Sequence, residues 1–294
     1  CMLCAGTFWG LMAPIGKDAM LHGIDGFDLV SFRVLGGAIL FWLTSLFTKK
    51  EHVPMKDILL LGVGGLFALV FNQCCYTIGL NMTSPSNSSI MTTSMPIFAM
   101  ILSFFILKEP ITFKKAGGVL LGCAGAVIII LTSATAGNAK VGNIWGDLLC
   151  MSAQFSWALY LAFFKPLAQK YSLFTVNKWM FTWATLLIWP FTLGHITDID
   201  FPNVPMSTWW ETGFVVFFGT YLSYICVIIG QKTLRPTVVS VYNYVQPIVA
   251  VSVSVAIGLA VFKLTQALAV VLVFSGVWLV VKSKSKRDTE RVRN

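Results

Sequence analysis

The segments Pro96-Ile-Phe-Ala99 and Pro247-Ile-Val-Ala250 lie at the centres of two copies of one pattern, 151 residues apart. The match runs without gaps over much of the middle and last thirds of the chain. Other matched pairs are Phe67 and Phe218, Cys75 and Cys226, Gly79 and Gly230, Pro85 and Pro236, and Gly125 and Gly276. Prolines at matched places inside apolar runs do not arise from composition alone, so the sequence predicts an internal duplication.

The composition places the chain in a lipid bilayer. Its residues are 56% hydrophobic and only 11% charged, and its mean hydropathy is +0.78. A soluble domain carries roughly 25% charged residues, so this chain cannot cover a water-facing surface of the usual size. Apolar stretches of about 20 residues, the length that crosses the hydrocarbon core, recur along it. They predict ten spans at 2–20, 28–47, 57–79, 86–107, 114–132, 146–164, 174–194, 208–230, 238–259 and 263–281.

Positive charge is distributed unevenly between alternate loops. The net charge is +9, but the loops on one predicted side hold 17 Lys and Arg residues, whereas those on the other side hold 3. The positive-inside rule places the richer side and both termini in the cytoplasm. This alternation argues against nucleic-acid binding. The tail from Lys282 to Arg287 is expected to anchor on anionic lipid.

The duplication and the span count together predict the architecture. We expect an all-α integral membrane protein in which two five-helix repeats surround a central cavity. Five is an odd number, so the second repeat is expected to be inverted relative to the first, as in many transporters. The expected divisions are a first repeat at 1–136, an outer linker at 137–145, a second repeat at 146–282 and a basic cytoplasmic tail at 283–294.

Amides and aromatic side chains of the apolar spans are the candidates for a substrate cavity. An amide in lipid is costly unless it is paired, so these side chains are expected to face the interior. A helix–helix hydrogen bond is the alternative role for each amide, and core packing is the alternative for each aromatic ring. The predicted cavity residues are Trp9, Asn72, Gln73, Tyr76, Asn87, Gln154, Trp157, Tyr221, Tyr224, Tyr242, Asn243 and Gln246.

Two prolines and two charged residues are candidates for moving or gating parts. Pro96 and Pro247 are expected near the middle of their spans, where a proline frees the carbonyl four residues back and allows a hinge; a fixed kink is the alternative. Arg33 is expected either to snorkel toward the outer surface or to form a gate pair with an acid such as Asp28. Glu109 is expected to act as a local cap and gate contact.

Several motifs of the chain recur in one membrane family. They are Trp9-Gly10, Arg33, Gly79-Leu-x-x-Thr-x-Pro85, Pro96 to Leu107-Lys-Glu109-Pro-Ile-Thr112, Gly117 to Gly125, and the second copy from Gly230 to Gly276. The chain therefore resembles a ten-helix, EamA-type member of the drug/metabolite transporter superfamily. The resemblance implies a basket-like bundle and, as in bacterial members, export of small metabolites. The family's Leu-x-Glu element is present at Glu109, but its counterpart in the second copy is Ala260.

The expected function is export of amino acids or related amphipathic solutes across the bacterial inner membrane by alternating access. A nucleotide-sugar or sugar-phosphate transporter would need more central basic residues than Arg33, Lys178 and Lys263 provide. A multidrug exporter is less favoured because no carboxylate lies in the middle of a span. A receptor or scaffold is the remaining alternative. No HExxH or GxSxG motif occurs, so we expect no enzyme, cofactor or metal, and a monomer whose partners are the bilayer and a small-molecule substrate.

The topology leads to a first test. A reporter fused after Lys282 should read as cytoplasmic, and one inserted beside Lys140 should read as external, because alternate loops differ in positive charge. Activity of a cytoplasmic reporter and a periplasmic reporter at each site is the measurement. The reverse pattern at both sites would show that the predicted orientation is wrong.

Overall fold

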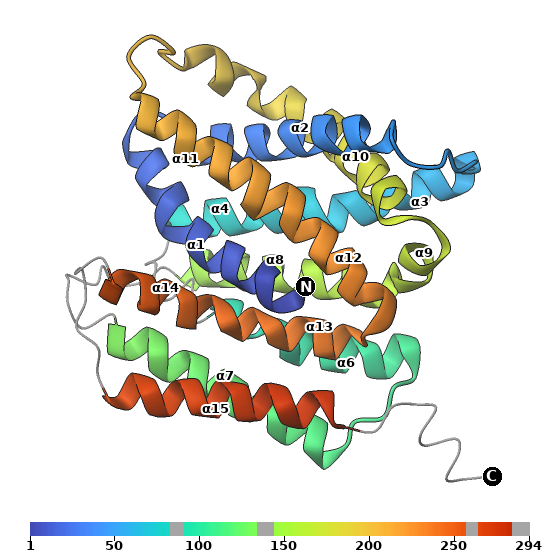
Figure 1. Cartoon of the computed structure of the whole chain (residues 1–294), viewed down its shortest axis with the longest axis vertical. Helices are drawn as coiled ribbons and strands as arrows, with labels where there is room; N and C mark the ends of the chain where they lie inside the picture. Colours follow the sequence, from blue (N-terminus) through green and yellow to red (C-terminus); the bar gives the residue numbers. More distant parts are fainter. Residues whose placement is uncertain (83–90, 134–143, 257–263, 284–294) are drawn as a thin grey trace. The chain divides into compact units, whose positions relative to one another are not determined.

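The computed structural model describes residues 1–82, 91–133, 144–256 and 264–283, and the regular elements in these ranges are helical (Figure 1). Asn87, residues 137–143 of the predicted linker, Ala260 and the tail beyond Ser283 lie outside the described residues. The chain divides into two compact units. Unit 1 comprises Cys1–Thr77 and Phe164–Thr233, and unit 2 comprises Ile78–Phe163 and Leu234–Asn294. Each unit therefore takes segments from both predicted repeats.

Unit 1 is built from two sets of helices that are far apart in the sequence. The first set is α1 (Met2–Leu21), α2 (Gly26–Ser45), α3 (Met55–Gly65), the π-helical turn η1 (Leu66–Phe71) and α4 (Asn72–Met82), whose last residues belong to unit 2. The second set is α9 (Lys165–Lys170), α10 (Leu173–Asp198), α11 (Met206–Val216), the π-helical turn η3 (Phe217–Leu222) and α12 (Ser223–Thr233).

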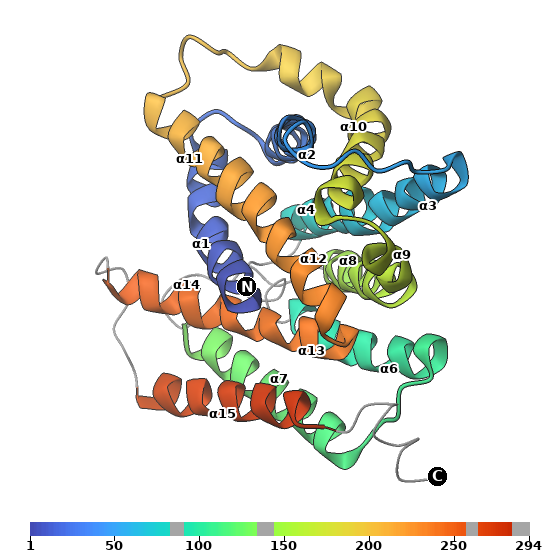
Figure 2. The same cartoon turned by 45° about the vertical axis from the view of Figure 1, so that its right-hand side comes forward.

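Unit 2 contains the remaining helices. They are α6 (Met95–Leu107), α7 (Phe113–Ser133), α8 (Ile144–Phe163), α13 (Pro236–Val241), the 3-10 turn η4 (Tyr242–Tyr244), α14 (Val245–Ala256) and α15 (Leu264–Val281). Figures 1 and 2 both show α7 and α15 side by side along much of their length. Small and β-branched side chains fill the core between them, including Val119, Ala126, Ala269, Val273 and Val280.

The helix boundaries follow the duplication seen in the sequence. The elements α11, η3 and α12 each begin and end 151 residues after α3, η1 and α4. A proline precedes both stretches, Pro54 before α3 and Pro205 before α11. Identical spacing of a cap, two helices and a rare π-helical turn shows that the two copies share local structure as well as sequence.

Within the described residues, helices lie in each of the ten segments that the apolar pattern indicates, but they are less regular than uninterrupted spans. Three described helices are long and apolar enough to cross a bilayer, at Gly26–Ser45, Met55–Gly79 and Met206–Thr233. Shorter apolar helices lie at Met2–Met12, Met95–Leu107 and Ala267–Val281. The ten-span inverted topology therefore stays a prediction. One element, the short helix α9, lies where the sequence suggested only a loop.

Polar caps fix where the second helix of each copy begins. Asp25 accepts a hydrogen bond from the Asp28 N–H at 2.8 Å, and Asp28 accepts one from the Asp25 N–H at 3.1 Å, which is a capping box before α2. Ser172 accepts a hydrogen bond from the Thr175 N–H at 3.2 Å before α10. The Ser172 N–H in turn donates to both oxygens of Glu51. These bonds satisfy donors that a helix start otherwise leaves open.

Glycines let α7 and α15 approach closely. A Cβ atom added to Gly118 would lie 2.7 Å from the Gly276 carbonyl oxygen, and one added to Gly276 would lie 2.6 Å from the Gly118 carbonyl oxygen. Backbone atoms cannot move aside as a flexible side chain can. Small residues at a helix interface allow this kind of close packing inside a membrane. The glycines of the Gly117–Gly125 motif are therefore not equivalent, because Gly117 faces open space.

This difference predicts unequal effects of one substitution at adjacent positions. Gly118→Val should lower the free energy of unfolding by about 1–3 kcal/mol, because the added atoms overpack the α7–α15 contact. Gly117→Val is the matched control and should remain within about 0.5 kcal/mol of the unmodified protein. Thermal and denaturant unfolding of the purified proteins in detergent compares them. Equal stability of the two variants would contradict this account of the packing.

Candidate functional site

The two π-helical turns bring polar backbone atoms to repeat-related places in unit 1. A π-helical turn is rare and often marks a functional site, because it disturbs the regular pairing of carbonyls in the helix. In η3 the Gly219 carbonyl accepts a hydrogen bond from Trp9 Nε1 at 2.9 Å. In η1 the Ala68 carbonyl accepts one from the Tyr224 hydroxyl at 3.4 Å. Side chains from other helices thus bind both turns.

Arg33 connects the same two turns. It lies on α2 with only 9% of its surface exposed. Its Nε donates to the Thr220 hydroxyl in η3 at 2.9 Å, and its Nη1 donates at 2.7 Å to Oε1 of Gln73, the second residue of α4. Gln73 Nε2 donates to Asn72 Oδ1 at 3.3 Å. A buried guanidinium therefore joins three segments of unit 1.

The partners of Arg33 differ from the one that the sequence suggested. Asp28 belongs to the capping box of α2, whereas Arg33 binds an amide and a hydroxyl. Snorkelling is also wrong for this residue, because the side chain is buried. Tyr76 and Tyr224 lie within electrostatic range of the guanidinium. Both hydrogen-bond partners of Arg33, Thr220 and Gln73, are uncharged side chains.

Aromatic rings surround this polar cluster. The ring centroids of Phe41 and Tyr221 are 4.8 Å apart, those of Phe181 and Tyr224 are 5.0 Å apart, and those of Trp9 and Tyr224 are 6.4 Å apart. Tyr221 and Tyr224 are both buried. The predicted cavity residues Trp9, Asn72, Gln73, Tyr76, Tyr221 and Tyr224 therefore belong to one neighbourhood of amides, hydroxyls and aromatic faces in unit 1.

Unit 2 holds a second polar group around Asn243. Its Nδ2 donates to Met95 Sδ at 3.1 Å, and its Oδ1 accepts a hydrogen bond from Gln246 Nε2 at 3.3 Å. Next to Asn243, the Tyr244 hydroxyl donates toward the carbonyls of Thr93 and Val119, at 3.4 and 3.2 Å. Tyr244 is buried, whereas Asn243 and Gln246 are half-buried. This group links the start of α6 to the η4 turn.

The two prolines lie at helix starts. Pro96 is in the first turn of α6, directly after Met95, and Pro247 is the third residue of α14. For Pro96 the expectation of a proline in the middle of a continuous helix is wrong, because the chain leaves the helix at Thr93–Ser94. Pro247 follows the 3-10 turn η4, which connects α13 to α14 without a break in the helical conformation. A proline in a first turn removes a donor that has no partner there. A hinge at these prolines stays a prediction.

Three other predicted cavity residues lie elsewhere in unit 2. Gln154 and Trp157 are buried on α8, and Trp157 packs on Tyr160 with ring centroids 5.4 Å apart. Tyr242 lies in η4 against the α7–α15 core. The place of these three residues in a substrate site stays a prediction.

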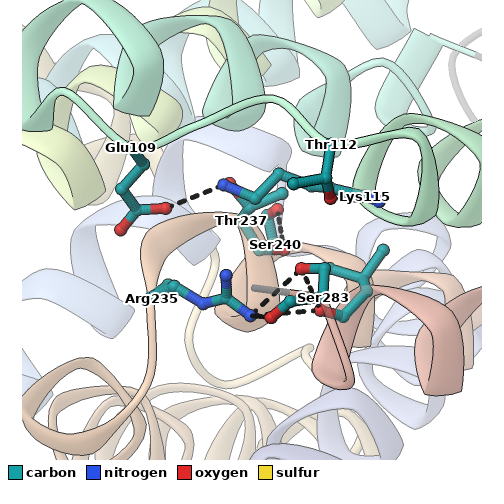
Figure 3. A network of polar contacts seen from close by, with 8 residues as sticks. Glu109, Thr112, Lys115, Arg235, Thr237, Ser240 and Ser283 are labelled. Carbon is teal, nitrogen blue, oxygen red and sulfur yellow. Dashed lines mark hydrogen bonds and ion pairs between the residues drawn. The ribbon is translucent and has the colours of Figure 1, made fainter. Parts of the chain in front are cut away.

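Glu109 belongs to a buried network at one end of unit 2 (Figure 3). Its Oε2 accepts a hydrogen bond from Lys115 Nζ at 2.9 Å, and both side chains are buried. Beside this ion pair, Arg235 donates to the Val280 and Ser283 carbonyls at 3.2 and 2.9 Å, at the end of α15. Glu109 is thus a structural contact between the α6–α7 connection and α7.

Sequence reasoning did not identify several of these partners. Thr220 and Met95 belong to no recognisable motif. Only their positions next to the predicted site residues Tyr221 and Pro96 could have indicated a role in the polar clusters. A further contact at the start of α3 was missed entirely: Lys170 and Tyr171 both donate to the Asp57 carboxylate. The hydrogen bond to Asp57 raises the pKa of Lys170 and also that of Tyr171.

An apolar, helical chain with buried polar clusters and repeat-related broken helices is a multi-pass membrane protein. The chain belongs to the EamA-like transporter family, whose family model matches residues 1–131 and 144–282. It is thus a membrane transporter, as the motifs of the sequence indicated.

Individual relatives agree with this assignment. The transporter YetK of Bacillus subtilis, named as uncharacterized, is 25% identical over 95% of this chain and 85% of its own length. YyaM of the same organism is 26% identical over 78% and 74%, and a transporter of Archaeoglobus fulgidus is 25% identical over 79% and 80%. A solved crystal structure shares the fold with a TM-score of 0.80 over 96% of both chains, at 18% identity.

The buried ion pair in Figure 3 gives a test of its structural role. Glu109→Gln should lower the free energy of unfolding by about 3–5 kcal/mol, because Lys115 would remain buried without an anion. The double variant Glu109→Leu with Lys115→Met should be closer to the unmodified protein, since both charges are removed. Unfolding in detergent measures both, with Lys114→Gln on the exposed neighbour as the control. A double variant less stable than Glu109→Gln would contradict this role.

Proposed function

We propose that this transporter exports small amphipathic metabolites, with amino acids as the leading class, across the bacterial cytoplasmic membrane by alternating access. The proposal includes ten spans in two inverted repeats, both termini in the cytoplasm, and no catalytic activity or bound cofactor. It rests on membership of the EamA-like family together with the chemistry of the cluster around Arg33.

The Arg33 cluster supports a substrate with one polar end and one apolar end. The guanidinium and the amides of Gln73 and Asn72 offer donors of the kind that bind a carboxylate. The rings of Trp9 and Tyr224, in T-shaped contact with each other, supply apolar surface beside them. Such a mixture of a few polar groups with aromatic walls is typical of sites for small molecules.

The alternatives fit less well. A nucleotide sugar or sugar phosphate carries several negative charges and favours a group of basic residues, whereas the cluster that the structure describes in unit 1 contains one guanidinium. A multidrug exporter for organic cations favours an acidic residue in the spans. In the described residues, the side chains that accept hydrogen bonds from Arg33 are an amide and a hydroxyl. Neither of them is an acidic group that would attract an organic cation.

A flux assay tests the function. Purified protein in liposomes should release preloaded radiolabelled amino acids faster than protein-free liposomes do. Nucleotide sugars and organic cations, loaded in the same way, should leave at the background rate. Flux of a nucleotide sugar without flux of amino acids would replace the proposed substrate class, and no flux of any loaded solute would contradict transport of these classes.

A variant at the Asn243 group tests its part in substrate binding. Gln246→Leu should slow transport of a polar amino acid more than transport of an apolar analogue, because one substrate hydrogen bond worth about 0.5–1.5 kcal/mol is lost. Gln169→Leu on the short helix α9 is the matched control, because Gln169 is exposed. An equal loss for both substrates would mean that Gln246 has a structural role, and unchanged transport would place the site elsewhere.

A further inference from the structure

A groove lies between α2 and α10 on the surface of unit 1. Its volume is about 380 Å³, and its lining is almost entirely apolar. The lining includes Ile39, Trp42 and Leu43 from α2 and Thr182, Leu186 and Trp189 from α10. In a chain that crosses a bilayer, an exposed apolar surface of this kind contacts lipid. The five large apolar side chains named here are 40–57% exposed.

One end of this groove carries a positive charge held on two aromatic rings. Lys178 Nζ lies 4.6 Å from the ring centroid of Trp42 and 5.7 Å from that of Trp179. The Trp42 and Trp179 rings meet edge to face with centroids 5.6 Å apart. The Trp42 ring is fixed further by its Nε1, which donates to the Thr182 hydroxyl at 2.9 Å. The cation therefore has a defined place beside the apolar groove.

The surroundings of Lys178 favour an anion at this end of the groove. α2 ends nearby at Ser45, and the chain that follows carries the exposed residues Lys49 and Lys50. Glu51 lies within electrostatic range of Lys178 and offsets one positive charge there; both of its carboxylate oxygens accept from the Ser172 N–H at the start of α10. The ends of α2 and α10 thus present more positive than negative charge here.

Charge and shape together define one ligand chemistry. We propose that the groove between α2 and α10 binds an anionic glycerophospholipid, with its phosphate at Lys178 and one acyl chain along the groove toward Trp189. The site lies on the membrane-facing surface of unit 1 and is separate from the Arg33 cluster. It does not depend on which solute the protein transports.

The orientation of this lipid follows from the charge pattern of the sequence. Lys178, Lys49 and Lys50 belong to the side that carries most of the Lys and Arg residues, which the positive-inside rule places in the cytoplasm. Anionic lipids of the cytoplasmic leaflet attract basic residues at this depth. Trp42 and Trp179 are suited to the same depth in the membrane, near the lipid headgroups, because their rings have an apolar body and a polar N–H.

Native mass spectrometry of the purified protein with phosphatidylglycerol tests the site. Lys178→Gln should weaken binding by about fivefold, the effect expected for one basic side chain at an anionic lipid. Lys114→Gln, which removes an exposed lysine of α7, is the control and should bind as the unmodified protein does. Equal binding by Lys178→Gln and the unmodified protein would overturn the proposal.

A second variant tests the groove independently of the charge. Ile39→Trp should fill the groove and reduce phosphatidylglycerol binding, whereas Leu120→Trp on the exposed face of α7 should leave it unchanged. If Lys178→Gln fails to fold, the comparison of Ile39→Trp with Leu120→Trp still tests whether the groove binds the lipid. Full binding by Ile39→Trp would overturn the proposal.

Two probes with only part of the lipid complete the test. Diacylglycerol keeps both acyl chains but lacks the phosphate, and glycerol 3-phosphate keeps the phosphate but lacks the chains. Both should bind much more weakly than phosphatidylglycerol. If diacylglycerol binds equally well, the groove selects no charge. If glycerol 3-phosphate binds equally well and depends on Lys178, the site is one for a soluble anion, and either result overturns the proposal.

Discussion

The hydrogen bonds of Arg33 are the constraint on which unit 1 depends. A guanidinium inside a membrane protein is costly unless its donors have partners, and here those partners come from two separate stretches of chain. Thr220 lies in η3 and Gln73 follows η1, so α2 can be placed only where both are within reach. Trp9 and Tyr224 bind carbonyls of the same two turns. One buried charge thus fixes the meeting point of α1, α2, α4 and α12.

The π-helical turns explain how a duplicated sequence yields two related sites of contact. Each copy contains an α-helix, a π-helical turn and a second α-helix with the same spacing. Local hydroxyls satisfy two carbonyls in and beside η3, since Thr220 donates to the Val215 carbonyl at the end of α11 and Ser223 donates to the Phe218 carbonyl in η3. The first copy has Leu69 and Asn72 at the matching positions. The copies therefore share backbone geometry but differ in the side chains they place beside it.

Unit 2 is held by different means. Close contact between the backbones of Gly118 and Gly276 joins α7 to α15, and the buried pair of Glu109 and Lys115 fixes the connection that leads into α7. Arg235 satisfies carbonyls at the end of α15. The family's Leu-x-Glu element is present at Glu109 but not at Ala260, the matching position of the second copy. Glu109 pairs with Lys115, which lies in the same copy. This ion pair therefore does not depend on a second glutamate at position 260.

The sequence by itself determined the membrane setting, the duplication, the family and the approximate position of every long helix, because hydrophobic length and repeat spacing are local properties of the chain. It also gathered Trp9, Gln73, Tyr221 and Tyr224 into one candidate site, since amides and tyrosines avoid lipid. Only the tertiary structure decided that Arg33 binds Gln73 and Thr220 rather than Asp28. Only the structure showed that a helix ends before Pro96, that a 3-10 turn precedes Pro247, and that Lys178 lies on Trp42 beside a groove. The contacts of Arg33 with Thr220 and of Lys178 with Trp42 join residues more than 100 positions apart. The pattern of apolar residues within one segment does not show which distant side chain will pack beside it.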